Sequence, residues 1–532
     1  MRETTELTEP PVGRLWLAHP LLVGAFPVLF LFAQNIGEQF SLGPLWEPLA
    51  LAIGAAAFIL LLALAVAWAV GGGPEKAAMA ASLLIGLALT YGHAWNLVGE
   101  TLRLHRYLLL PWAGLALIGL VLIWRMRPTT VRRGTVGVAV AVAVLTVVNL
   151  VPIAGLAMRD RAVEAAPGVS PGPSGGPTAA DGRDIWYIVP DRYAGADGLR
   201  ETYGYDNTPV LDALRERGFE VAEHATASYL KTQFSLVSTL NLEELDLEAL
   251  GAEATDGEDF GPIYRRLAQS HAVERFLEER GYRYLHVGSF LGETAGNAGA
   301  DATFLYGETS EFGAVLADTT VLRALERVAP RAIAEGIHER LVAQTEFQLD
   351  VLHDLADAPG RNFVFAHLMV PHPPYAFNAD GSRVTDAQKA SRTVEEQYVE
   401  LVQFTNARLL ALVDRLHAGP PETWPIIVIA ADEGPFPDQY AKHERGFHWL
   451  SAEPDELLRK FSVLAAMSVP GIDRSGLEAA GFSDDLTLVN LFRVVFNAAF
   501  ETDMPMLPRR NWAFVDQVHI YDAVDITDRI PR

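Results

Sequence analysis

The stretch PIIVIAADEGPF, residues 425–436, does most to decide the fold of this chain. It begins with an apolar run that is long enough for a strand, and Asp432 and Glu433 follow directly after it. A continuous apolar run of this length predicts a strand that is buried on both faces, as in a parallel sheet. Two adjacent carboxylates repel each other and resist burial unless a cation neutralises them. The stretch therefore predicts a metal centre beyond the end of a buried strand, where open α/β sheets bind ligands.

Two other stretches repeat this pattern of an apolar run that ends at a polar side chain. In DIWYIVPDRYAG the run leads to Asp191, and in NFVFAHLMVPHPPYAF it leads to His367 and then to His372. The carboxyl ends of parallel strands lie at one edge of a sheet, and ligands bind there. We therefore expect these side chains and the acids of the first stretch to converge on one site.

A stretch rich in Ser and Thr, ATASYLKTQFSLVSTLN, lies between Asp191 and His367. It predicts a turn that leads into a helix, and it offers hydroxyl groups to the same site. Ser228, Thr232 and Ser235 are the candidates. The structural role open to each of them is that of a helix N-cap.

The two parts of this 532-residue chain differ in composition and charge. Residues 1–183 hold twelve of the 42 basic and ten of the 66 acidic residues, so the remainder has a net charge of −26. Such an acidic surface disfavours nucleic acid as a partner, and a highly soluble surface is its simplest interpretation. The chain has no cysteine, which excludes disulfides, thiolate metal sites and cysteine nucleophiles.

Five apolar segments near the N-terminus each approach or exceed the ~20 residues that cross a bilayer core. The first is interrupted by Pro20 and Pro27. A cleaved signal peptide does not fit, because no small-residue cleavage site follows a short apolar core. We therefore expect a five-helix transmembrane bundle over residues 1–157. Its segments are 15–34, 48–70, 77–98, 107–125 and 134–157.

The charges of the short loops predict the orientation of this bundle. Four arginines between the fourth and fifth segments place that loop in the cytoplasm by the positive-inside rule. Arg103 and Arg106, in the loop before, favour the opposite orientation, but they are outnumbered. Five crossings then export everything that follows, so we expect a multi-pass membrane protein with its C-terminal domain outside the cytoplasm. The four arginines are Arg125, Arg127, Arg132 and Arg133.

After the bundle, residues 158–183 are rich in Pro, Gly, Ser and Ala, which predicts a linker with little ordered structure. Residues 184–532 then alternate between strand-like and helix-like segments, including a long helical region at 317–357. This alternation predicts a mostly parallel, doubly wound sheet. We therefore expect one α/β domain over residues 184–532.

The motifs of this domain resemble those of the alkaline phosphatase superfamily. They are an Asp after the first strand, a hydroxyl that opens the next helix, HLMVPHPPY in the middle and Asp-Glu-Gly late in the chain. With membrane segments in front, the chain looks most like sulfatase-domain proteins of the lipoteichoic acid synthase and phosphoethanolamine transferase type. It shares YIVPDRYA, HPPYAF and VNLFRVVFN with sulfatase-like membrane proteins of bacteria. The resemblance thus implies a bacterial cell membrane and an alkaline-phosphatase-like fold.

The resemblance also implies one divalent cation, held by Asp191, Thr232, Asp432 and, where the family has a histidine, Glu433. A carboxylate in place of an imidazole makes the site harder and more anionic, which favours Mn²⁺, Mg²⁺ or Ca²⁺ over Zn²⁺. Thr232 becomes the implied nucleophile, because a metal-bound hydroxyl is activated for attack on phosphorus. The C/S-x-P-x-R motif of sulfatases is absent, which argues against sulfate-ester hydrolysis by that mechanism.

Further residues are candidates for contact with a substrate. Lys231, beside Thr232, is placed to stabilise the charge of a phosphoryl group. His372 is preferred over His367 as the residue that binds the phosphoryl group or protonates the leaving group. His443 and His448, in KHERGFHW, are additional candidates for substrate binding.

The sequence thus predicts a metal-dependent hydrolase or transferase that acts on phosphate esters of a membrane lipid or envelope glycan. Sulfate esters have less support as substrates. Because Glu433 stands where the family has a histidine, an alternative remains open. It is a catalytically silent sulfatase-like envelope protein that binds a glycan or lipid. A transporter does not fit, because the apolar segments carry almost no central ionisable residues.

Overall fold

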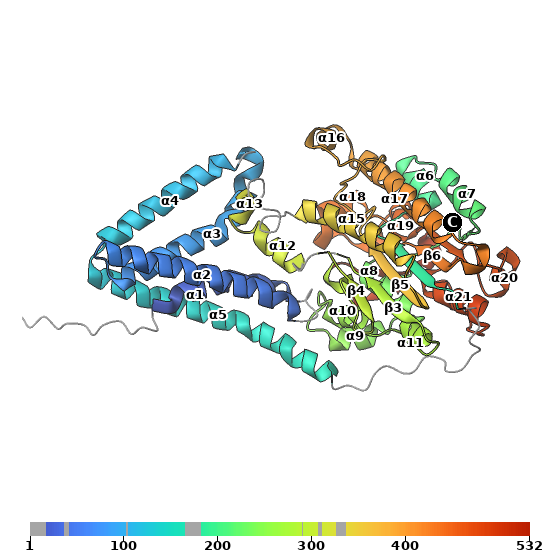
Figure 1. Cartoon of the computed structure of the whole chain (residues 1–532), viewed down its shortest axis with the longest axis horizontal. Helices are drawn as coiled ribbons and strands as arrows, with labels where there is room; N and C mark the ends of the chain where they lie inside the picture. The colour runs from blue at the N-terminus through green and yellow to red at the C-terminus, as the bar shows by residue number, and fades with distance from the viewer. Residues whose placement is uncertain are drawn as a thin grey trace, which may run out of the picture. The chain divides into compact units, whose positions relative to one another are not determined.

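The computed structural model describes seven stretches of the chain, which form two compact units (Figure 1). The first unit comprises Met1–Ala166 and Thr309–Ile337, and the second comprises Pro167–Glu308 and His338–Arg532. The described residues are 17–36, 42–102, 105–164, 182–289, 291–306, 311–325 and 337–531.

Long apolar helices make up most of the first unit. Four of them, α2 to α5, are long and apolar enough to cross a membrane. Large apolar side chains point outward from these helices, and Trp68 and Leu97 are both 86% exposed. Lipid is the solvent that accepts such a surface, so the chain is a membrane protein with transmembrane helices. The helices are α1 (His19–Gln34), α2 (Gly43–Ala69), α3 (Pro74–Leu102), α4 (Arg106–Arg125) and α5 (Pro128–Glu164).

The first of the five predicted spans corresponds to α1, which has 16 residues and contains Pro27. At 1.5 Å per residue it is about 24 Å long, less than the ~30 Å of a bilayer core. Helix α1 contacts α2, α3 and α5 and buries Val28 and Phe32 completely. Four spans are therefore supported by length and composition, and a bundle of five is not confirmed.

A segment from the middle of the chain also belongs to this membrane unit. It forms the short helices α12 (Glu311–Asp318) and α13 (Leu322–Leu325). Phe312 and Leu316 of α12 are buried in an apolar cluster with residues of α1, and the ring of Phe312 meets that of Phe32 edge to face at 5.2 Å. The sequence predicted one domain without interruption over 184–532, whereas Thr309–Ile337 groups with the membrane helices.

A glycine allows this segment to approach α3 closely. The amide of Gly92 donates a hydrogen bond of 2.9 Å to the carbonyl of Thr319. A Cβ atom at Gly92 would lie only 2.1 Å from the carbonyl oxygen of Asp318, so any larger residue would push the segment away. The helix predicted at 317–357 is divided in the structure. It begins within α12, continues with the separate helix α13, and its last part is α15 (Ile337–Leu355) of the second unit.

The second unit contains a seven-stranded sheet in the order β2-β7-β6-β1-β5-β3-β4. Strand β1 is parallel to β5 and β6, β3 is parallel to β4 and β5, and β7 is antiparallel to β2 and β6. The mostly parallel sheet predicted from the sequence is thus confirmed. The strands are β1 (Ile185–Pro190), β2 (Glu220–Val221), β3 (Arg283–Val287), β4 (Ala302–Phe304), β5 (Asn362–Leu368), β6 (Ile426–Ala430) and β7 (Ala465–Ser468), with a separate pair, β8 (Trp512–Phe514) and β9 (Ala523–Asp525).

Helices cover this sheet, and its central strands are buried throughout (Figure 1). Phe492 of α21 packs its ring 5.1 Å from Tyr187 of β1 and 6.1 Å from Phe363 of β5. The unbroken apolar runs of the sequence therefore form the centre of the core. The helices are α6 (Ala196–Tyr203), α7 (Thr208–Glu216), α8 (Thr232–Asn241), α9 (Leu247–Glu253), α10 (Gly261–Ala268), α11 (Ala272–Glu278), α15, α16 (Asp386–Ser391), α17 (Val394–Leu416), α18 (Asp438–Lys442), α19 (Pro454–Phe461), α20 (Arg474–Ala479) and α21 (Leu491–Phe500).

The linker predicted at 158–183 lies mostly outside the described residues. Its first part is helical, because α5 continues to Glu164. Residues 165–181 are not described.

Candidate metal centre

The register of the parallel strands brings two acids to the same level. In the β1–β6 ladder Ile188 lies opposite Ile429. Asp191 and Asp432 each follow three residues after these two, so they lie at the same level beyond the strand ends. In the β1–β5 ladder His367 lies opposite Val189. All three polar residues therefore lie at the carboxyl end of the sheet.

Asp191, His367 and Asp432 come together as a group whose ligand atoms lie within 4.8 Å of one another. The Nε2 atom of His367 is 3.6 Å from Asp191 Oδ2 and 3.9 Å from Asp432 Oδ2. All three side chains are fully buried. The distances are too long for hydrogen bonds, and they leave space between the ligand atoms.

Several polar atoms of this group have no hydrogen-bond partner among the described residues. They are both carboxylate oxygens of Asp191, Oδ2 of Asp432 and Nε2 of His367. An uncompensated buried charge costs several kcal/mol, so folding would not favour such an arrangement on its own. A divalent cation would satisfy all four atoms at once, and the residues fit a metal ion for this reason.

The electrostatic environment of these three residues also suits a bound cation. Burial raises the pKa of Asp191 well above its ordinary value, and the charge of Asp432 raises it further. Burial and then the neighbouring Glu433 raise the pKa of Asp432. Burial lowers the pKa of His367 to about 3, so its imidazole is neutral. Carboxylates that repel each other and a neutral imidazole are the forms that a cation binds.

Two residues outside the group hold His367 in this orientation. Its Nδ1 atom makes a hydrogen bond of 2.8 Å with Oγ1 of Thr294, and Nε2 of Gln348 donates to its carbonyl at 2.7 Å. The imidazole therefore presents Nε2 to the two acids, as metal-binding histidines do when a second residue fixes the other ring nitrogen. Neither residue was predicted, because no spacing in the sequence connects Thr294 or Gln348 to a strand end.

Thr232 is the first residue of α8, and its hydroxyl lies near enough to Asp432 to lower the pKa of that carboxyl. Lys231 precedes it, and its ammonium donates to the hydroxyl of Tyr440 at 2.7 Å. The hydroxyls of Ser228 and Ser235 are buried without a hydrogen-bond partner in the described structure. Of the three candidate hydroxyls, that of Thr232 is the one that affects the pKa of an acid of the group.

Glu433 points toward a different set of charges. Its Oε1 is 2.9 Å from Nε of Arg192, and its Oε2 is 3.0 Å from Nζ of Lys460. The carboxylate is thus paired with two cations and is not part of the three-residue group. Of the ligands implied by the resemblance, Asp191 and Asp432 lie together with His367 beside them, whereas Glu433 lies between Arg192 and Lys460.

The remaining histidines lie in varied surroundings. Nδ1 of His372 bonds to the carbonyl of Pro373, and burial and then the charge of Arg192 hold the pKa of His372 well below its ordinary value. His443 is exposed, and His448 is 60% exposed with Nδ1 3.6 Å from Asp516 Oδ2. Neither exposed histidine belongs to the metal-binding group.

No protein-family model matches the chain, and no curated protein matches it. Among solved structures, the chain is similar to the C-terminal periplasmic domain of EcEptC from Escherichia coli in complex with Zn, with 13% identity and a TM-score of 0.43 over 68% of this chain and 98% of that chain. It is similar to the integral membrane protein lipooligosaccharide phosphoethanolamine transferase A from Neisseria meningitidis, with 12% identity and a TM-score of 0.38 over 91% of this chain and 95% of that chain. A third is a protein in the alkaline phosphatase superfamily from Vibrio parahaemolyticus, with 12% identity and a TM-score of 0.37 over 65% of this chain and 78% of that chain.

Proposed function

We propose that this chain is a membrane-anchored, metal-dependent enzyme that acts on phosphate esters of a lipid or cell-envelope polymer. The observation that carries the proposal is the buried group of Asp191, His367 and Asp432, with four ligand atoms that lack a hydrogen-bond partner in the described structure. A purely structural cluster would pair these atoms, because leaving them unpaired is costly. Functional sites are where such cost is retained.

The donor set favours certain ions. Glu433 as a ligand would favour Mn²⁺, Mg²⁺ or Ca²⁺, but its carboxylate is paired with Arg192 and Lys460. With His367 in its place, the set is two carboxylates and one imidazole, with the Thr232 hydroxyl close by. Because imidazole suits transition metals and carboxylate suits harder ones, we propose Mn²⁺ or Zn²⁺. When bound, the ion would supply positive charge that polarises the phosphoryl group and favours the alkoxide form of a nearby hydroxyl.

We propose Thr232 as the nucleophile. Its Oγ would form a bond to phosphorus while the bond from phosphorus to the leaving-group oxygen breaks. The carboxylate of Asp432, whose pKa the Thr232 hydroxyl lowers, would take up the proton of this hydroxyl. The N-terminal amides of α8 lack a side-chain cap, so they are free to stabilise phosphoryl oxygens. Water or a second alcohol would then release the phosphoryl group, in hydrolysis or in transfer.

His372 contributes as a neutral group in this proposal. Its pKa lies well below the ordinary value, so it is a poor source of a proton for the leaving group. A neutral imidazole still makes hydrogen bonds to phosphoryl oxygens. We therefore propose that His372 binds substrate, and that Lys231, next to the nucleophile, does the same with its charge.

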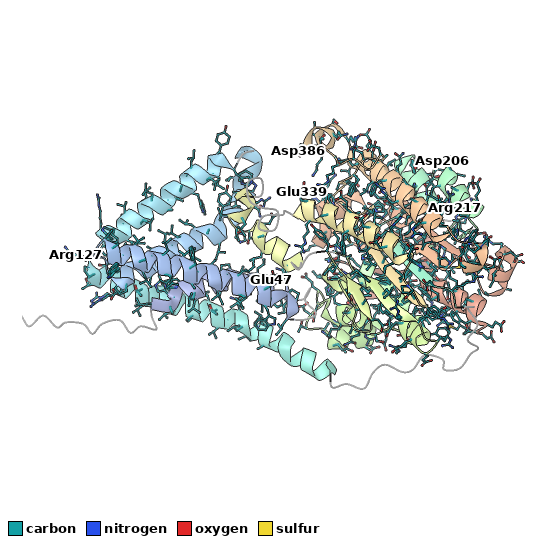
Figure 2. The ribbon with its side chains drawn as sticks, viewed as in Figure 1. Glu47, Arg127, Asp206, Arg217, Glu339 and Asp386 are labelled. Atoms are coloured by element: carbon teal, nitrogen blue, oxygen red, sulfur yellow. The ribbon has the colours of Figure 1, made fainter. Side chains whose placement is uncertain are left out.

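We propose that the α/β unit works outside the cytoplasm of a bacterial cell. Figure 2 shows Arg127 and Glu47 at opposite ends of the membrane unit, and basic residues favour the cytoplasmic end. A cytoplasmic N-terminus would in addition require α1 to cross the membrane as the fifth span. Reporter fusions after Gln34 and after Arg532 test it, because both should be active only outside the cytoplasm. Activity of the Arg532 fusion in the cytoplasm would refute this orientation, and activity of the Gln34 fusion there would refute the crossing of α1.

The enzymatic proposal is tested on the purified full-length protein in detergent. We expect bound divalent metal and release of p-nitrophenol from bis(p-nitrophenyl) phosphate, with loss of both after EDTA treatment or in Asp432→Asn. The matched control is Asp386→Asn, an exposed acid on α16 (Figure 2), which should change neither. Wild-type protein that binds metal or an envelope glycan yet cleaves no phosphate ester would favour the silent binding protein instead.

A further inference from the structure

A second charged cluster adjoins the metal centre, and the proposed chemistry does not yet use it. It consists of Arg192, Glu433 and Lys460. The carboxylate of Glu433 is 1% exposed and the ammonium of Lys460 is fully buried, while the side chain of Arg192 is 21% exposed. Of the three, Arg192 therefore has the most access to a ligand.

Three cationic side chains lie close to the ring of Phe436. Nζ of Lys460 lies 3.4 Å from the centroid of the Phe436 ring, and Cζ of Arg192 lies 4.4 Å from it. Nζ of Lys231, the residue before the proposed nucleophile, lies 5.0 Å from the same centroid. Cations are attracted to the face of such a ring within about 6 Å. Arg192 is therefore close to the residue that precedes Thr232.

The backbone holds Arg192 in an uncommon conformation. Its φ is 61°, in the left-handed region that residues other than glycine seldom adopt. Its amide donates to Asp432 Oδ1 at 3.3 Å, and its carbonyl accepts from the hydroxyl of Tyr398 at 2.8 Å. Such strain persists where surrounding contacts enforce it, and it is concentrated at functional sites.

The guanidinium of Arg192 is only partly occupied. Its Nε donates to Glu433 at 2.9 Å, and within the described part of the chain its two Nη groups have no hydrogen-bond acceptor. These groups carry four N–H donors in a planar fork, a geometry that suits phosphate oxygens. The guanidinium is thus fixed on one edge by Glu433 and available on the other.

The charges of the region leave room for one anion. The two acids of the metal centre would balance a divalent cation. Beyond them, Arg192, Lys231 and Lys460 bring three positive charges, and the carboxylates of Glu433 and Glu444 offset two of them. The region thus has one more basic than acidic side chain, which favours an anionic ligand.

A close approach of two backbone segments keeps this cluster in place. The amide of Gly434 donates to the carbonyl of Lys460 at 2.9 Å, and the ammonium of Lys460 donates back to the carbonyl of Gly434 at 2.8 Å. A Cβ atom at Gly434 would lie 2.3 Å from the carbonyl oxygen of Arg459, so a side chain there would separate the segments. Lys460 is thereby held against Glu433, which in turn is held against Arg192.

We propose that Arg192 binds the phosphoryl oxygens of the substrate, and that Glu433 is a positioning residue that holds its guanidinium in place. This inference rests on the proposed function and adds two residues to it. It also gives Glu433 a role other than metal ligand. Glu433 would hold the guanidinium of Arg192, which binds the substrate.

The first test replaces Arg192 in the full-length protein. Arg192→Lys keeps the charge and loses the planar fork, so KM for bis(p-nitrophenyl) phosphate should rise by about 10- to 100-fold while bound metal stays at the wild-type level. The inhibition constant of inorganic phosphate should rise by a similar factor. Arg217→Lys is the matched control, an arginine of the same unit paired with Asp414 at 2.7 Å (Figure 2). An unchanged KM in Arg192→Lys, or an equal rise in the control, would overturn the proposal.

The second test separates positioning from folding. Glu433→Gln should raise KM by about 10-fold with kcat within about 3-fold and metal content unchanged, because only the anchor of Arg192 is weakened. If this variant unfolds, Glu433→Gln combined with Lys460→Met removes both partners of the buried pair and should fold with the same raised KM. Loss of metal in the folded variant would show that Glu433 is a ligand after all and would refute its role as an anchor.

A third measurement keeps this proposal distinct from the enzymatic one. Binding of inorganic phosphate to metal-loaded protein, measured by calorimetry, requires no turnover. If the wild-type protein binds phosphate and Arg192→Lys weakens that binding by about 10-fold, the assignment of Arg192 holds even when no ester is cleaved. Equal phosphate affinity in both proteins refutes it, whatever the enzymatic assay gives.

Discussion

Asp432 and Glu433 are consecutive acids after the same strand, and the fold gives them opposite surroundings. Asp432 faces Asp191 and His367, whereas Glu433 is ion-paired with Arg192 at 2.9 Å and with Lys460 at 3.0 Å. A buried acid without a partner is a candidate ligand, and a buried acid between cations is a candidate anchor. Neighbours in sequence thus serve different tasks when a strand end directs their side chains to different sides.

We expect the largest effect from a substitution at Asp432. Asp432→Asn removes a ligand charge and the base beside Thr232, so we expect metal to be lost and kcat/KM to fall by at least about 10³-fold. Metal analysis and the phosphodiesterase assay measure both effects. Retention of metal with full activity would show that Asp432 differs little from Glu433.

The nucleophile gives the next largest effect. Thr232→Ala leaves the acids and His367 in place, so metal should stay bound while kcat falls by about 10³-fold. A phosphorylated protein detected by intact mass in the wild type should be missing in this variant and present in Thr232→Ser. A phosphorylated Thr232→Ala protein would transfer the role to another hydroxyl, and Ser228→Ala and Ser235→Ala are the variants to compare.

A substitution at Glu433 tests the other side of the comparison. Glu433→His places the family's usual histidine next to Asp432 but leaves Arg192 and Lys460 without their carboxylate. Breaking a buried ion pair costs about 3–5 kcal/mol, so we expect a lower melting temperature and no gain in metal affinity. The unfolding transition and metal titration of the purified variant measure this. Tighter metal binding with unchanged stability would restore Glu433 to the ligand set.

We expect the smallest effect on catalysis from removal of residues 309–337, which group with the membrane helices. A fragment of 184–532 carries Phe312 and Leu316, whose apolar partners lie in the membrane unit, so it should aggregate. Replacing 309–337 by a short Gly/Ser linker should give a soluble fragment with metal content and KM close to those of the full chain. Size-exclusion chromatography distinguishes the two. A monomeric fragment that retains 309–337 would contradict the assignment of this segment.

The sequence predicts the parts of this structure that depend on local pattern. Apolar runs give buried strands, and a polar residue after each run gives Asp191, His367 and Asp432, because the ends of parallel strands share one edge of the sheet. The separate roles of Asp432 and Glu433 could not be predicted this way. They depend on Lys460, which a contact at Gly434 brings to Glu433, and on the left-handed turn at Arg192.

The membrane unit shows the same limit. Hydropathy predicts its long helices, since each satisfies the length of a bilayer core by itself. Residues 311–325 are too short to show that signal, and their membership depends on packing against Phe32 and Gly92, far away in sequence. Long-range contacts of this kind are not visible in local periodicity.

The metal content of the purified protein shows whether Asp191, His367 and Asp432 hold a metal ion. Elemental analysis of the purified full-length protein should find about one divalent transition-metal ion per chain in the wild type and in Glu433→Gln. In Asp191→Asn, His367→Ala and Asp432→Asn it should fall by at least about tenfold, because each removes one of the converging ligands. A wild-type protein that binds no metal when saturated with Mn²⁺ or Zn²⁺, or a metal level that depends on Glu433 and not on His367, would contradict the account.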